Sequence, residues 1–200
     1  MAVTSSRVDR ITMKVVGGFV VALTVALAAQ SFVAAGSFIW AHELTLSLLA
    51  DASTAVTGPV TAATFSSVDV TTDQLSAAAR ACFAVGSALL GLTALAVGGA
   101  LAWLMFAASS GRPFSSGLYR VTLAGAFALV LGPLLATAAT GFGSMQAAFE
   151  LDAGVPDVLV PGWTMSSWGV AIPLVGLGLI ILAYVFRYMQ RLERDTAGLV

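Results

Sequence analysis

Hydrophobic residues dominate four long stretches of the chain, and shorter polar segments separate these stretches. The four stretches, which contain no Asp, Glu, Lys, Arg or His, are residues 15–40, 81–108, 121–149 and 168–186. A helix needs about 20 predominantly apolar residues to cross a bilayer. Lipid offers the backbone no hydrogen-bond partners, so such a segment must satisfy its own peptide groups as a helix. The pattern therefore predicts four membrane-spanning helices.

The flanking polar residues predict where these helices begin and end. We expect spans at about residues 14–40, 76–108, 119–145 and 167–190. The connecting loops are then about 41–75 and 146–166 on one side of the membrane, and about 109–118 on the other. Short connections join antiparallel neighbours. The expected fold is a single all-α domain, an up-down-up-down four-helix bundle in the membrane with small structured external loops.

The basic residues predict the orientation. Eight of the nine lie in the N-terminal segment, the link between the second and third spans, and the tail: Arg7, Arg10, Lys14, Arg112, Arg120, Arg187, Arg191 and Arg194. Segments rich in Lys and Arg stay in the cytoplasm. Both termini are therefore expected there, and the loops at 41–75 and 146–166 are expected outside. The Ala, Val and Gly bias favours a bacterial source and hence the bacterial cytoplasmic membrane.

Composition agrees with a location in lipid. Apolar residues make up 58% of the chain and charged residues 10%, whereas soluble domains carry about 25% charged residues. The net charge of -1 gives no reason to expect direct binding to nucleic acid. The lone cysteine, Cys82, excludes an intrachain disulfide.

The first span has an alternative interpretation as a cleaved signal peptide. It follows basic residues, and Val33, Ala34 and Ala35 precede Gly36 like a small-residue cleavage site. The apolar run at residues 15–40 is 26 residues long, however, and the apolar core of a signal peptide has about 7–15. This length favours an uncleaved anchor.

The external loops contain signals of local structure. Thr71 and Gln74 have the spacing of a helix capping box, which predicts that the second helix begins near Thr72. Residues 67–70 alternate like a strand, and residues 157–160 form a similar piece between two prolines. We expect these two pieces to pair as a small external ribbon.

Small residues predict close helix contacts in the second span. The helix-packing candidates are Ser87, Gly91, Ala94 and Gly98. Small residues spaced four apart let helix backbones approach closely in lipid. The second span is therefore expected to be the most buried helix, although a general abundance of Ala and Gly would produce the same pattern.

Two short strings resemble a known family. Gly111–Ser115 reads GRPFS between the second and third spans, and Arg191–Val200 reads RLERDTAGLV after the last. Together they resemble the bacterial domain-of-unknown-function family 2975, and most of all its actinobacterial members. The family implies four spans, no established activity, and an interaction with a cytoplasmic partner such as a small helix-turn-helix regulator. The interaction candidates are Gly111, Arg112, Pro113, Phe114, Ser115, Arg191, Asp195, Thr196 and Gly198. Ala197 departs from the family pattern, which has an acidic residue there.

No catalytic or metal-binding motif is present. His42 and Glu43 match the first two residues of a zinc-protease motif, but no second His follows. Cys82 lacks an evident base, and the acidic residues form no calcium-loop pattern. We therefore expect no enzyme activity, no metal and no cofactor.

The sequence favours a non-enzymatic interaction, regulatory or sensory protein of the bilayer. The alternative is a small-solute transporter or channel subunit that acts as a homo-oligomer. Its motivation is the Gly-rich second span together with Pro133 and Pro173, which are expected to bend the third and fourth helices. Against it, none of the four apolar stretches carries the charged residue that ion-coupled transporters use.

Overall fold

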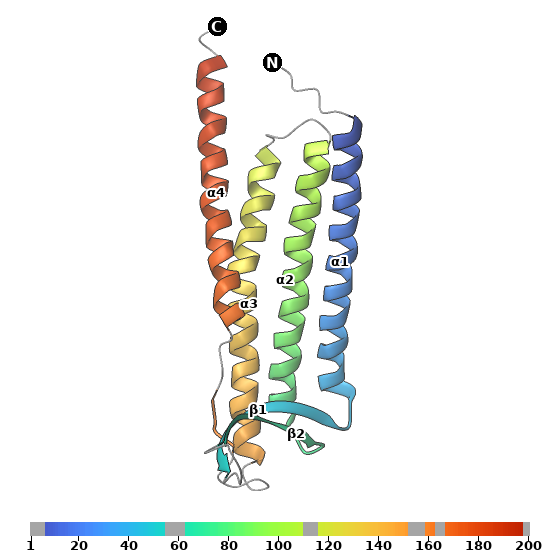
Figure 1. Cartoon of the computed structure of the whole chain (residues 1–200), viewed down its shortest axis with the longest axis vertical. Coiled ribbons are helices and arrows are strands. Elements are labelled where there is room, and N and C mark those ends of the chain that lie inside the picture. The colour runs from blue at the N-terminus through green and yellow to red at the C-terminus, as the bar shows by residue number, and fades with distance from the viewer. Residues whose placement is uncertain (1–6, 55–62, 110–115, 152–158, 163–166, 198–200) are drawn as a thin grey trace. The chain divides into compact units, whose positions relative to one another are not determined.

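The computed structural model describes residues 7–54, 63–109, 116–151, 159–162 and 167–197 (Figure 1). The elements in chain order are α1 (Arg7–Trp40), β1 (Leu44–Thr54), β2 (Ala63–Thr72), α2 (Ala77–Ser109), α3 (Ser116–Leu151) and α4 (Ser167–Ala197). The prediction of a mostly helical chain is confirmed. The hairpin of β1 and β2 is larger than the small loop structure that the sequence predicted.

Three of the helices are long and apolar enough to cross a membrane. The corresponding segments are Lys14–Trp40, Ala77–Ala107 and Tyr119–Leu151. The fourth helix contains a shorter apolar segment, Gly169–Val185. The chain is therefore a membrane protein by the length and composition of its helices.

The chain divides into two compact units. The first, here called the helical unit, contains residues 1–30, 90–134 and 167–200. The second, here called the hairpin unit, contains residues 31–89 and 135–166. The helical unit holds parts of α1, α2 and α3 and the whole of α4, whereas the hairpin unit holds both strands and the remaining parts of the first three helices.

Helices of the helical unit approach one another through glycines. A Cβ added to Gly98 of α2 would collide with the side chain of Thr24 on α1. A Cβ on Gly132 of α3 would collide with Thr93 of α2. Gly176 of α4 lies in the same way against α3, where an added Cβ would come within 2.7 Å of Val130. Close backbone approach of this kind is how helices gain packing contacts in lipid.

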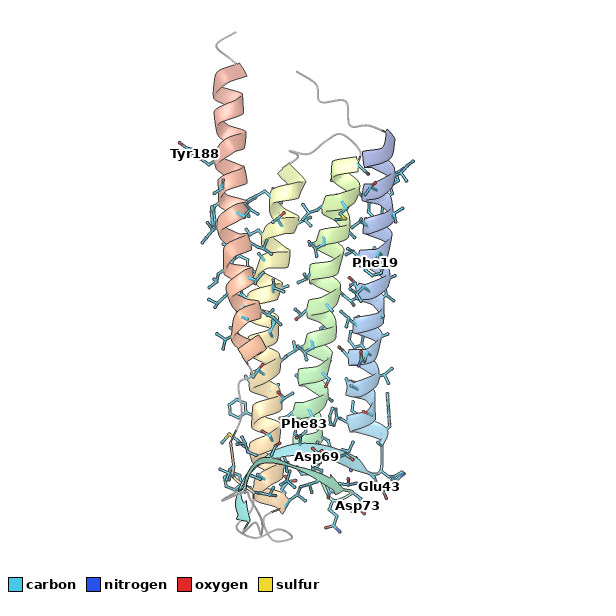
Figure 2. All side chains as sticks on the ribbon, viewed as in Figure 1. Phe19, Glu43, Asp69, Asp73, Phe83 and Tyr188 are labelled. Carbon is cyan, nitrogen blue, oxygen red and sulfur yellow. The ribbon has the colours of Figure 1, made fainter. Side chains whose placement is uncertain are left out.

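Large apolar side chains of the helical unit point away from these contacts. Apart from Pro133 and Pro173, its buried hydrophobic residues in the described ranges are alanines, namely Ala28, Ala102, Ala126 and Ala183. In contrast, Phe19, Leu174 and Ile181 are 69%, 61% and 66% exposed. Tyr188 also points away from the unit (Figure 2) and is 64% exposed. A water-soluble domain buries its large hydrophobic residues, so this inverted arrangement agrees with lipid around the helices.

The prediction that the second span is the most buried is wrong. Among the three long apolar helices, the buried share of the most apolar window is 28% for α3, 17% for α2 and 11% for α1. The number of neighbouring helices does not explain the difference, because α2 contacts α1 and α3 while α3 contacts α2 and α4. A count of small residues along one helix therefore does not set how deeply that helix is buried.

The helix-packing candidates and the prolines occupy different environments. Gly91 and Gly98 are buried, and Ser87 and Ala94 are half-buried. Pro133 and Pro173 lie inside α3 and α4, and both are buried. The bends expected at these prolines stay a prediction.

Replacing Gly98 by valine tests the close approach of α1 and α2. The added side chain would collide with Thr24, and overpacking of this kind typically costs about 1–3 kcal/mol. We expect a lower midpoint of thermal unfolding for Gly98→Val in detergent. Gly99→Val is the matched control, because Gly99 is exposed and has open space around its Cα. Equal midpoints for the two variants would contradict the described contact.

Candidate functional site

The first strand of the hairpin has one buried face and one exposed face. Leu44, Leu46, Leu48 and Ala50 are buried, and the residues between them are exposed or half-buried. This alternation is the period of a strand that packs on one side only. The sequence prediction missed β1, although its Leu-Thr-Leu-Ser-Leu pattern at residues 44–48 was a usable signal.

The second strand pairs with the first in an antiparallel register. Leu46 lies opposite Val70 and Leu48 opposite Val68, with an irregularity in β1 between Leu49 and Ala52. On the exposed face the hydroxyls of Thr45 and Thr71 are 3.1 Å apart and share a hydrogen bond. Cross-strand pairs of this kind stabilise a hairpin that would be marginal by itself.

The hairpin packs on helix ends through a hydrophobic core of its own. The buried members of this core are Leu46, Leu48, Leu75, Ala79, Phe83, Ala147, Ala148 and Leu159. The ring of Phe83 on α2 (Figure 2) stacks on Phe38 of α1 with the ring centroids 5.3 Å apart. The hairpin unit is thus held together by large side chains, unlike the helical unit.

The predicted pairing of residues 67–70 with residues 157–160 is wrong. Residues 67–70 belong to β2 and pair with β1. Leu159 forms an isolated bridge with Ala50 of β1, and the amide of Val160 donates to the carbonyl of Leu49 at 3.0 Å. Strand β1, which the sequence did not predict, is therefore the partner of both pieces. Residues 157 and 158 lie outside the described part of the chain.

The predicted capping box at Thr71 and Gln74 is also wrong. Thr71 and Thr72 belong to β2, and the Thr72 hydroxyl accepts from the amide of Gln74 at 3.1 Å in the following turn. Helix α2 begins at Ala77, and the Ser76 hydroxyl accepts from the Ala79 amide at 3.2 Å. A serine in this position satisfies a backbone donor at the helix start.

Glu150 and Gln146 of α3 bind the start of α2 through Ser76. The amide of Ser76 donates to the Glu150 carboxylate at 2.9 Å. The side-chain amide of Gln146 donates to the Ser76 hydroxyl at 3.4 Å. The negative charge of Glu150 lies at the positive end of the α2 dipole, which is a favourable position. These contacts join α2 and α3 within the hairpin unit.

Arg80 connects three segments of the hairpin unit by donating to backbone carbonyls. Its guanidinium donates to the carbonyl of Ala41 at 2.8 Å, to that of His42 at 3.4 Å, and to that of Asp73 at 3.1 Å. It thereby joins the end of α1 to the turn between β2 and α2. Arg80, directly before the apolar stretch 81–108, is also the one Lys or Arg residue on the side expected outside. Its use as a hydrogen-bond donor explains why a positive charge is kept there.

A pocket of about 430 Å³ lies in the hairpin unit. Its lining combines five hydroxyl side chains with apolar residues and two glycines: Ser47, Leu48, Leu49, Ser67, Phe83, Thr137, Thr140, Gly141, Ser144 and Gly162. The strands supply Ser47, Leu48, Leu49 and Ser67, whereas α3 supplies a row of polar residues. The lining residues that the structure describes include no charged side chain and no histidine.

Close approach of α2 and α3 positions the α3 side of the pocket. A Cβ added to Gly86 of α2 would lie 2.5 Å from the methyl group of Thr140 and 3.0 Å from the carbonyl of Ala136. A Cβ on Gly143 of α3 would lie 3.2 Å from Cys82 and Phe83. The absence of side chains at Gly86 and Gly143 therefore lets the two helices approach closely enough to form one wall.

The α3 hydroxyls in the pocket already donate to backbone carbonyls. The Thr140 hydroxyl donates to Ala136 at 3.0 Å and Thr137 at 3.1 Å, and the Ser144 hydroxyl donates to Gly141 at 2.8 Å and Gly162 at 3.0 Å. The contact with Gly162 also fixes the segment after Leu159 against α3. Because each hydroxyl has one proton and two lone pairs, these oxygens remain able to accept hydrogen bonds.

The interaction residues expected from the sequence are not among the described residues of the lining. Residues 110–115, which contain Gly111, Arg112, Pro113, Phe114 and Ser115, are outside the described residues, and so is Gly198. Arg191, Asp195 and Thr196 lie in the last turns of α4. The sequence prediction therefore named none of the residues that line the pocket.

Two aromatic residues and an arginine meet in the helical unit. The rings of Tyr119 on α3 and Tyr184 on α4 meet edge to face with centroids 6.3 Å apart. The guanidinium of Arg187 lies 5.2 Å from the centre of the Tyr119 ring. A cation over a tyrosine ring is a favourable contact, so this cluster helps to join α3 and α4.

The residues considered for catalysis do not form a described site. His42 is exposed, and Cys82 is half-buried between α2 and α3. Within the described ranges, no three His, Cys, Asp or Glu side chains are grouped as metal ligands.

Replacing Arg80 by methionine tests the role of its guanidinium. Methionine keeps an unbranched side chain but loses all donors, and a hydrogen bond to a charged group contributes about 1.5–3 kcal/mol. We expect the hairpin unit to open more often, so that the half-buried thiol of Cys82 reacts at least several-fold faster with a maleimide. Arg120→Met, an exposed position in the helical unit, is the control. An unchanged Cys82 rate in Arg80→Met would show that the three contacts add no stability.

Comparison of the chain with protein-family models, with curated proteins and with solved structures finds no match. The resemblance to family 2975 therefore stays a prediction from the two short strings.

Proposed function

We propose that this chain is a non-enzymatic, multi-pass membrane protein with a sensory or interaction role, in which the hairpin unit recognises a molecule outside the cell. The observation that carries this proposal is the pocket in the hairpin unit. It lies in a unit that has its own hydrophobic core. Pockets of about 300–1,000 Å³ that combine apolar walls with a few polar groups are typical of ligand sites.

A four-span topology with both termini in the cytoplasm supports this placement. The apolar part of α4 is 17 residues long, at the lower end of the range of about 17–25 residues for a spanning helix. Uncharged residues at 167, 168 and 186 extend it. The positive-inside rule then places the hairpin unit, whose described basic residue is Arg80, on the outer face. Exposed Glu43, Asp69 and Asp73 lie on the hairpin or next to its ends (Figure 2).

Helix α4 supports a role for the C-terminal tail in signalling to the cytoplasm. It continues for twelve residues beyond Val185 to Ala197, about 18 Å at 1.5 Å per residue. A helix of this length extends past the apolar segment. The family resemblance suggests a cytoplasmic protein partner for this segment, such as a helix-turn-helix regulator. A location in the bacterial cytoplasmic membrane fits a pocket outside the cell and a C-terminal segment in the cytoplasm.

The transporter alternative receives less support. Glycine contacts bring the helices of the helical unit together, and Thr93 and Thr122 are the polar residues buried among the described positions. A solute path through such an interior requires polar partners along its length. The pocket favours binding over transport, because its described lining belongs to the hairpin unit alone.

Labelling of single cysteines tests the orientation. In a Cys82→Ser background, Glu43→Cys and Asp69→Cys place thiols at exposed positions of the hairpin unit, and Arg120→Cys places one at an exposed position of the helical unit. A membrane-impermeant maleimide added to intact spheroplasts should label the first two at least tenfold faster than the third. Permeabilisation should abolish the difference. The opposite pattern in intact spheroplasts would reverse the topology and refute outside recognition.

Deletion of residues 195–200 tests the interaction role of the tail. We expect the truncated protein to insert normally but to lose a cytoplasmic partner that copurifies with the full chain after crosslinking, because the deletion removes the end of α4. Deletion of residues 1–6 is the control at the other terminus. Recovery of the same proteins with both truncations would contradict a role for the tail.

A further inference from the structure

We infer that the pocket of the hairpin unit binds a neutral, hydroxyl-bearing amphiphile: a molecule with hydroxyl groups along one edge, an apolar face, and no net charge. This inference rests on the recognition role proposed above and names the chemical class of the recognised molecule.

The neutral side chains of the described lining set the first requirement. All ten lining residues that the structure describes are neutral. A charged group that leaves water needs an opposite charge or several strong hydrogen bonds, and without them its burial is unfavourable. Anionic and cationic ligands would therefore lose more on entering this pocket than they regain.

The state of the α3 hydroxyls sets the second requirement. Thr137, Thr140 and Ser144 are spaced three and four residues apart, so they lie along one face of α3. The protons of Thr140 and Ser144 are used in bonds to backbone carbonyls. Their oxygens keep free lone pairs, so a ligand that donates to them leaves these bonds intact. Hydroxyl groups provide such donors without carrying a charge.

The other side of the pocket sets the third requirement. Leu48 and Phe83 are 1% and 8% exposed and belong to the core of the unit, and Leu49 lines the pocket from the same strand. Of these three, the half-buried Leu49 offers the ligand an apolar surface, which favours a molecule with an apolar face. Ser47 and Ser67, on paired strands, add hydroxyls that can rotate to donate or accept.

Two sources would supply this chemistry, a neutral lipid of the bilayer and a soluble glycoside. Photolabelling in lipid nanodiscs distinguishes them. The probes are a diazirine-bearing monoacylglycerol in the bilayer, a diazirine-bearing short-chain alkyl glucoside in the water, and a diazirine-bearing phosphatidic acid as the charged control. Crosslinked peptides are mapped by mass spectrometry.

We expect at least one neutral probe to label peptides that contain residues 44–49 or 137–144, and the charged probe to label them at least tenfold less. Labelling by monoacylglycerol alone would identify a lipid source, and labelling by the glucoside alone a soluble one. The inference is overturned if neither neutral probe labels these peptides, or if the charged probe labels them equally well.

A matched pair of variants locates the labelling in the pocket. Ser47→Phe adds a large ring at an exposed lining position, and Thr45→Phe adds the same ring two residues away, at an exposed position outside the lining. We expect at least a tenfold loss of labelling in Ser47→Phe and no loss in Thr45→Phe. Equal labelling of both variants would refute the site.

Thr140→Val gives a second measurement that does not depend on filling the pocket. Valine keeps the branched shape of threonine and removes the acceptor oxygen. We expect labelling to fall about fivefold or more while the reaction rate of the Cys82 thiol stays the same. Unchanged labelling in Thr140→Val would overturn the role given to the α3 acceptors.

The inference and the proposed function fail in different ways. If the neutral probe labels the pocket but its addition does not change the proteins crosslinked to the tail, the ligand class holds and the sensory role fails. If those crosslinked proteins depend on residues 195–200 but neither neutral probe labels the pocket, the interaction role holds and the ligand class is wrong.

Discussion

The close approach of helix backbones is the contact on which the helical unit depends. In lipid, large apolar side chains gain little by turning inward, because the surrounding chains are as apolar as they are. Glycine removes the obstacle to backbone contact, as Gly98 does against Thr24 and Gly132 against Thr93. The same constraint explains why alanines are buried while Phe19 is mostly exposed.

The hairpin unit is held together by a different kind of contact. Its core contains Leu46, Leu48 and Phe83, as a water-soluble domain would, and its polar backbone groups are joined by side chains. Arg80 supplies three donors to carbonyls at the end of α1 and before α2. The planar guanidinium suits this task because it presents several donors in a fixed geometry. A unit built in this way can hold a pocket with a mixed polar and apolar lining.

The pocket depends on residues whose individual roles are ordinary. Ser76 caps α2, Gly86 lets α3 approach, and Ser144 holds the carbonyl of Gly162. None of these residues forms a motif with another in the sequence. The same pocket is lined by a row of hydroxyls on α3 and by hydroxyls of two strands, which gives it its preference for a neutral donor.

The sequence by itself determined the helices, because lipid and backbone hydrogen bonding leave an uncharged run of about 20 residues little choice but to be helical. It also contained the alternation at residues 44–48, which indicates a strand but is a weaker signal than the long apolar runs. Only the tertiary structure decided that β1 pairs with both β2 and Leu159, that Ser76 caps α2, and that α3 is more buried than α2. These outcomes depend on partners that are distant in the chain, and periodicity within one segment carries no information about them.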